Sequence, residues 1–184
     1  MPASRTQLAK WATNESQNDD PASALTTQGY DFAAQVLRNP RSVAHLKGER
    51  LSRLVGRLGF ALSYIRDDSG PRRVHFAAAM AKAAPPAFEI WFGSLAVDSD
   101  GLYMFWDHAR NFRDDRPRLL HDAMFDALRM QLQSSNVWIQ QSALHGFGHL
   151  HDPECVPVIA TFLEVCDQPW LAEYARKAAR FEVL

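Results

Sequence analysis

The chain has 184 residues, 47% of them hydrophobic, which suits one compact globular domain with a sizeable core. Its formal net charge of −1 gives no overall attraction to nucleic acid or to acidic membranes. The two cysteines, with no secretory apolar segment ahead of them, argue against a disulfide framework, and no apolar run approaches the ~20 residues that span a bilayer. We therefore expect a soluble cytoplasmic protein that does not associate with membranes.

The N-terminal part of the chain divides into a polar arm and the start of a helical domain. Residues 1–24 offer little apolar surface to offset the entropy of ordering, so part of this arm is expected to be mobile. Residues 25–184 are predicted to form a single α-helical repeat domain. Its first helix is expected over Thr26–Arg38 and ends at Asn39, because the residue before Pro40 is pushed out of the helical region.

The longest helical pattern runs from Val43 to Ile65, with apolar residues on one face. Gly48, Gly56 and Gly59 each cost a helix roughly 1 kcal/mol relative to alanine. A break or a close helix crossing is therefore predicted near one of these glycines.

The middle of the chain reads as a series of shorter helices. An alanine-rich helix is expected over Arg73–Ala84, ended by two prolines, and Phe88–Val97 is predicted to be a separate buried helix, although its periodicity also fits a strand. Two further helices are expected over Leu102–Phe112 and Leu119–Leu132.

The clearest unit is a helix, a tight turn and a second helix over residues 136–163. Asp152 reads as the N-cap of the second helix and Pro153 as its first helical position. Each helix has one apolar stripe, formed by Ile139, Ala143, Phe147 and Leu150 in the first and by Val156, Ile159, Ala160 and Leu163 in the second. The two helices are expected to pack against each other.

This unit resembles a HEAT-like repeat of the kind found in phycobilisome-lyase-type and other bacterial helical-repeat proteins. The residues that carry the resemblance are Val137, Ser142-Ala143-Leu144, Phe147-Gly148, Leu150, Asp152-Pro153, Val156-Pro157 and Phe162-Leu163. The resemblance implies an all-α fold, a HEAT-like (armadillo-like) α-α superhelix of antiparallel helix pairs, with residues 170–182 as a capping helix. It also implies a non-enzymatic scaffold that binds a protein or peptide on its helical surface.

Three histidines in this unit form the first candidate site. His145 and His149 lie four residues apart on one helical face and His151 follows, so they are candidate metal ligands. The expected position of Asp107 lets it face His145, which makes Asp107, His145 and His149 candidate catalytic residues of a metal-dependent or acid–base enzyme. The competing interpretation is structural: Gly146 and Gly148 let a neighbouring helix approach closely and the histidines hydrogen-bond inside the stack, with no cofactor.

A basic stripe forms the second candidate site. Arg50, Arg53 and Arg57 share one helical face within a segment that holds nine basic and three acidic residues, a local charge of +6 that leaves −7 for the remaining chain. Such a stripe could bind phosphates or nucleic acid, or an acidic partner. We expect the protein partner instead, with these arginines and the aromatic side chain of Trp138 as the binding residues.

Overall fold

The computed structural model describes residues 27–43, 45–62, 65, 69–94, 100–110 and 114–183, so the expected arm over residues 1–24 lies outside the described part. Within these ranges the chain forms helices and no strand, which confirms the all-α fold class. No described helix is both long and apolar enough to cross a bilayer. In chain order the helices are α3 (Thr27–Arg38), the 3₁₀ helix η1 (Pro40–Val43), α4 (Glu49–Leu62), α5 (Pro71–Ser94), α6 (Asp100–Tyr103), the 3₁₀ helix η3 (Met104–Arg110), α7 (Arg118–Leu132), α8 (Val137–Leu150), α9 (Cys155–Val165) and α10 (Pro169–Ala179).

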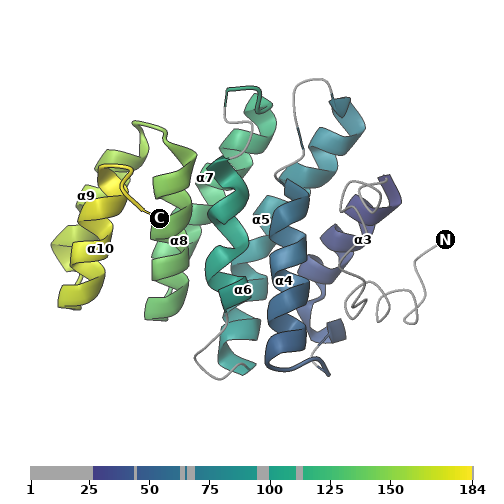
Figure 1. Cartoon of the computed structure of the whole chain (residues 1–184), viewed down its shortest axis with the longest axis horizontal. Helices are drawn as coiled ribbons and strands as arrows, with labels where there is room; N and C mark the ends of the chain where they lie inside the picture. Colours follow the sequence, from purple (N-terminus) through teal and green to yellow (C-terminus); the bar gives the residue numbers. More distant parts are fainter. Residues whose placement is uncertain are drawn as a thin grey trace.

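The helices pack in two rows. In one row α5 lies between α3 and α7 and contacts both. In the other row α4 contacts α6 and η3, these two contact α8, and α8 contacts α10. Figure 1 shows α4, α6, α8 and α10 following one another across the molecule, with α3 at one end and α9 and α10 at the other. Helix α8 contacts α7, η3 and α10, so it is enclosed by neighbours on several sides. The predicted packing of α8 on α9 is wrong, because α9 lies against α10 and α7 instead.

An aromatic cluster fills the space between the rows. The ring of Phe105 meets Phe88 edge-on at 5.2 Å and Trp106 edge-on at 4.7 Å. All three side chains are essentially inaccessible to solvent. Each such side chain contributes about 1.5–3 kcal/mol through burial alone, so this cluster anchors η3 in the core.

Helix α5 corrects the prediction of two helices separated by prolines, because it continues through Pro85 and Pro86 to Ser94. Each proline in a helix interior costs about 3 kcal/mol or more. Phe88 and Trp91 beyond them are fully buried, while α5 as a whole lies against α3 and α7. Burial on both sides of the prolines therefore outweighs the local preference to stop. The helical conformation predicted from Phe88 is confirmed as far as Ser94, and residues 95–97 lie outside the described part.

The expected helix Val43–Ile65 is also shorter than predicted. The chain passes through η1 and a turn before α4 begins at Glu49, and Gly48 ahead of it has a φ of 54°, a left-handed conformation that favours glycine. The predicted break near a glycine is thus confirmed at Gly48. At the other end α4 is described as far as Leu62, and residues 63 and 64 lie outside the described part.

Two further boundaries differ from the sequence prediction. The α-helix expected over Leu102–Phe112 is instead a single α-helical turn, α6, followed by the 3₁₀ helix η3 as far as Arg110, and residues 111 and 112 lie outside the described part. Helix α9 begins at Cys155, two residues after Pro153. Asp152 nonetheless caps the turn, because its side chain accepts a hydrogen bond of 2.8 Å from the backbone N–H of Glu154.

Candidate metal centre

Two glycines bring the segment that carries Asp107 directly onto α4. A Cβ atom on Gly59 would lie 2.3 Å from the carbonyl oxygen of Phe105, and one on Gly101 would lie 1.9 Å from the carbonyl oxygen of Ser52. The backbone N–H of Gly101 donates a hydrogen bond of 2.8 Å to the Ser52 hydroxyl. The close crossing predicted near the glycines of α4 is confirmed at Gly59, and it fixes the position of η3.

A third glycine brings η3 onto α8. Gly146 lies between the two histidines of α8, and a Cβ atom there would lie 2.5 Å from Leu128 and 2.8 Å from the Cβ of Trp106. The indole N–H of Trp106 donates a buried hydrogen bond of 2.8 Å to the Gln131 side chain. The predicted close approach at Gly146 is confirmed. It places Asp107, the residue after Trp106, against the face of α8 that carries the histidines.

Asp107, His145 and His149 converge at this crossing. The Nε2 atoms of the two histidines lie 3.1 Å apart. The Oδ1 atom of Asp107 lies 3.4 Å from Nε2 of His145 and 3.2 Å from Nε2 of His149. The same three atoms therefore form a nearly equilateral triangle, and each belongs to a buried residue, with exposures of 6% for Asp107, 0% for His145 and 5% for His149.

Two tyrosines hold the far side of the His145 ring. The Tyr174 hydroxyl of α10 lies 2.7 Å from Nδ1 of His145 and 2.5 Å from the Tyr103 hydroxyl of α6. The Tyr103 ring also lies 4.4 Å from the His145 ring. Burial raises the pKa of both tyrosines, so they are neutral hydrogen-bonding groups at physiological pH.

The triangle has the dimensions of a metal-ligand set. A tetrahedral Zn²⁺ ion with bonds of about 2.0–2.1 Å holds neighbouring ligand atoms about 3.3 Å apart. The three distances of 3.1, 3.2 and 3.4 Å bracket this value. Two imidazoles and one carboxylate also form a ligand set typical of zinc and non-haem iron proteins. A Tyr174 hydroxyl on Nδ1 of His145 is the outer hydrogen bond that orients a histidine ligand.

The third histidine of the unit does not join the centre. His151 follows α8 with a φ of 54° in the left-handed region, and its ring stacks on Phe181 at 4.8 Å. The structure thus unites Asp107, His145 and His149 as the sequence suggested and leaves His151 apart. Tyr174 comes from α10, and no local signal in the sequence marks it as a partner of His145.

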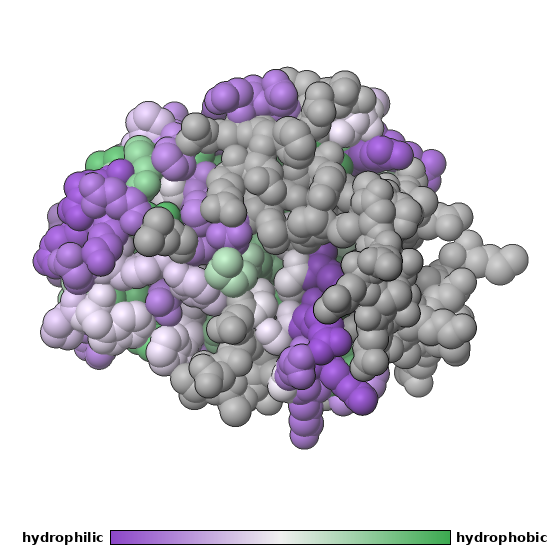
Figure 2. Space-filling model, in the orientation of Figure 1, coloured by the Kyte–Doolittle hydropathy of each residue, from purple (hydrophilic) through white to green (hydrophobic). Residues whose placement is uncertain are grey.

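The predicted binding residues lie elsewhere on the surface. Arg50 and Arg53 are exposed and Arg57 is half-buried, on a face where Figure 2 shows a column of hydrophilic side chains over α4. Arg53 forms an ion pair with Glu49 one turn earlier. None of the three arginines belongs to the buried group of Asp107, His145 and His149.

Trp138 lies on α8 at some distance from the arginines along the row of helices. Its ring contacts that of Trp170 from α10, with centroids 5.5 Å apart, and the two side chains are 38% and 42% exposed. The structure thus gives Trp138 an exposed aromatic neighbour that sequence reasoning did not identify.

Comparisons with known proteins add nothing to these observations. No model of a protein family, no curated protein and no solved structure matches the chain. The geometry of the described residues is therefore the basis for the functional assignment.

Proposed function

We propose that this protein binds a divalent transition-metal ion through Asp107, His145 and His149, with Zn²⁺ as the best fit. The observation that supports this proposal is the triangle of ligand atoms with sides of 3.1, 3.2 and 3.4 Å, buried at the crossing of η3 and α8. Three protein ligands leave one tetrahedral position for water or a substrate atom, which is the pattern of catalytic rather than purely structural zinc sites.

Charge balance also supports a cation here. A buried carboxylate is costly unless an opposite charge lies beside it. Asp107 faces two imidazoles, which are neutral when they bind a metal through a nitrogen lone pair. A divalent ion would compensate the carboxylate, and it would act as a Lewis acid toward whatever occupies its fourth position.

Metal binding would also fix the protons of the tyrosine pair. If Nε2 of His145 binds the ion, Nδ1 carries the proton and donates it to the Tyr174 oxygen. The Tyr174 hydroxyl then donates to Tyr103, its neighbour at 2.5 Å. The competing arrangement is an internal ion pair in which one protonated histidine compensates Asp107 without any metal.

Calorimetric titration of the chelator-treated protein with Zn²⁺ distinguishes these arrangements. We expect one ion per chain, with affinity reduced at least about 100-fold in Asp107→Asn, His145→Gln and His149→Gln, because each removes a ligand. Tyr174→Phe should weaken binding about 10-fold, because it removes only the group that orients His145. His75→Gln on the exposed face of α5 is the matched control and should bind as the unmodified protein does.

The proposal fails if Zn²⁺ does not bind, or if the three ligand variants bind it as well as the control. A loss of folding would be recognised by circular dichroism before titration. In the folded protein, Zn²⁺ at 100 times its Kd should stabilise by about 2.7 kcal/mol, which gives a second measure through thermal unfolding.

We propose as a second function that the chain is a HEAT-like α-α superhelix that binds a protein or peptide partner. The order of contacts along the two rows of helices and the exposed pair Trp138–Trp170 support it. A double variant, Trp138→Ala with Trp170→Ala, should no longer recover the partner in a pull-down. Variants of Arg50, Arg53 and Arg57 should still recover it, or bind it more weakly. A protein that recovers no partner in either form argues against it.

Nucleic-acid binding by the arginine stripe receives less support, because Arg53 already pairs with Glu49. This function predicts an affinity for nucleic acid that falls steeply with rising salt, and the absence of binding at low salt would exclude it.

Cys155 and Cys166 are both free thiols, which supports the proposal of a reducing, cytoplasmic location.

A further inference from the structure

Helix α9 is unusually apolar for its position at the surface. Its eleven residues include a single charge, Glu164, yet only Cys155, Ile159 and Phe162 are buried. Val165 is 79% exposed at the end of the helix. An exposed apolar surface of this kind marks an interaction site when it is continuous with other apolar residues.

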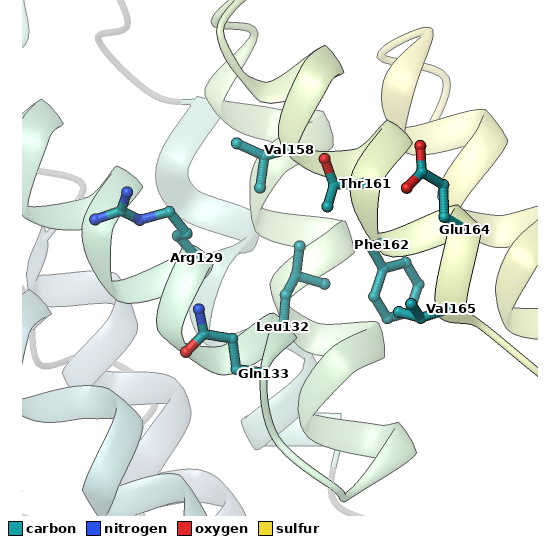
Figure 3. Close-up of a pocket in the computed structure, with 8 residues that line it drawn as sticks. All are labelled: Arg129, Leu132, Gln133, Val158, Thr161, Phe162, Glu164 and Val165. Atoms are coloured by element: carbon teal, nitrogen blue, oxygen red, sulfur yellow. The ribbon is translucent and has the colours of Figure 1, made fainter.

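That continuity is provided by a pocket of about 410 Å³ between α7 and α9. Helix α7 packs closely on α5 but makes only a small contact with α9, so the row of helices opens between α7 and α9. Figure 3 shows the side chains that line the opening: Arg129 and Leu132 from α7, Gln133 directly after it, and Val158, Thr161, Phe162, Glu164 and Val165 from α9. Its lining is mainly apolar, and Val165 stands at its rim.

The two walls of the pocket carry opposite charges. Arg129 lies on the α7 wall and Glu164 on the α9 wall. Arg129 also donates a hydrogen bond of 3.3 Å to Asp126, and that pair is exposed to solvent. Such an exposed pair contributes well under about 1 kcal/mol, so Arg129 can exchange it for another carboxylate at little cost.

We propose that this face is an interface between two copies of the chain related by a two-fold axis. An isologous interface requires a surface that complements itself, so that each copy offers both the projection and the opening that receives it. Here Val165 provides the projection, the α7–α9 pocket the opening, and Arg129 with Glu164 the charges that pair across the axis in both directions. A partner of single charge would satisfy only one wall.

Sedimentation velocity over a range of protein concentrations tests the proposal. We expect a dimer with a Kd at or below the order of 100 μM and a monomer for Val165→Glu, which places a charge in each apolar pocket. Val165→Ile is the matched control and should remain dimeric. Val165 is exposed, so neither variant should affect folding of the single chain.

Charge reversal tests whether a second copy of the chain, and not another molecule, covers this face. Arg129→Glu and Glu164→Arg should each weaken the dimer about 10-fold, and the double variant should restore it, because the pairs across the axis are then re-formed with exchanged signs. A different protein partner or a small apolar ligand predicts no such restoration. A wild-type chain that stays monomeric at about 1 mM, or a Val165→Glu chain that dimerises normally, would overturn the proposal.

Discussion

Helices α8 and α9 follow one another in the chain and are both largely apolar, but α8 lies inside the fold and α9 at its surface. Helix α8 is enclosed by α7, η3 and α10, and ten of its residues are buried, among them His145 and His149. Helix α9 lies at the end of the molecule and buries only three side chains. The residues on which the two proposals rest are therefore polar and buried on α8, and apolar and exposed on α9.

The two proposals place a partner on each helix. A divalent ion would bind the two buried histidines and the carboxylate of Asp107. A second copy of the chain would cover the exposed valines of α9. Substitutions that should affect one helix strongly and the other weakly test this difference.

Truncation of an aromatic residue on α8 is expected to have the largest effect. Phe147 is fully buried and its ring meets Phe125 edge-on at 5.6 Å. Phe147→Ala should lower the free energy of unfolding by about 3–5 kcal/mol in urea denaturation. Val156→Ala on the exposed side of α9 should cost less than about 1 kcal/mol. Equal losses in the two variants would remove the distinction between the helices.

A single methyl group on α8 tests how closely the helices cross at the metal centre. Gly146→Ala should lower the free energy of unfolding by about 1–3 kcal/mol, because the new Cβ meets Trp106 and Leu128. Gly56→Ala on α4 is the control of opposite sign. Its nearest neighbour would lie at 3.9 Å, so we expect a gain of up to about 1 kcal/mol in helix stability. A neutral Gly146→Ala would show that η3 does not press on α8.

The two cysteines allow the burial at the two ends of α9 to be compared, because Cys155 begins the helix and Cys166 follows its last residue. Burial raises the pKa of the Cys155 thiol to about 12, and Cys166 is only half-buried. An alkylating reagent at neutral pH should therefore modify Cys166 and leave Cys155 until the protein unfolds, as mass spectrometry of the peptides can show. Modification of both thiols at the same rate in the native state would contradict the assigned burial.

The same thiol gives a prediction for stability against pH. Because the pKa of Cys155 is higher in the folded state than in the unfolded state, its contribution is fully present below about pH 9 and declines as the pH rises toward 12. Cys155→Ala should reduce this decline in urea denaturation followed across that range, while Tyr103 and Tyr174, whose pKa values burial also raises, still contribute above about pH 10. A decline of equal size in the variant would assign it to other groups.

The smallest effect is expected on the surface of α4. Arg53→Ala breaks the ion pair with Glu49, which is exposed on both sides. The free energy of unfolding should change by less than about 0.5 kcal/mol. A loss above about 1 kcal/mol would mean that the arginine stripe belongs to a network that stabilises the fold.

The sequence was sufficient for the fold class and for the helices whose ends are marked locally. Apolar periodicity located α7 and α8, and it located most of α10. It failed at Pro85 and Pro86, where burial on both sides of a local helix breaker keeps α5 continuous. It also failed at η3, because the conformation of that segment depends on packing against α4 and α8 through Gly59 and Gly146.

The candidate site was predictable in part for the same reason. His145 and His149 share a helical face, so their spacing alone places them together. Asp107 required a guess about how helices stack, and the structure brings it to the two histidines. Tyr174 joins from α10 through a contact between residues 29 positions apart, which no local pattern encodes.

X-ray absorption at the zinc edge of the reconstituted protein tests the metal centre most directly. The account predicts one ion per chain with two imidazole nitrogens and oxygen ligands at about 2.0–2.1 Å, and loss of one imidazole in His149→Gln. A spectrum showing only water-like oxygen ligands, or one that His149→Gln leaves unchanged, would contradict it.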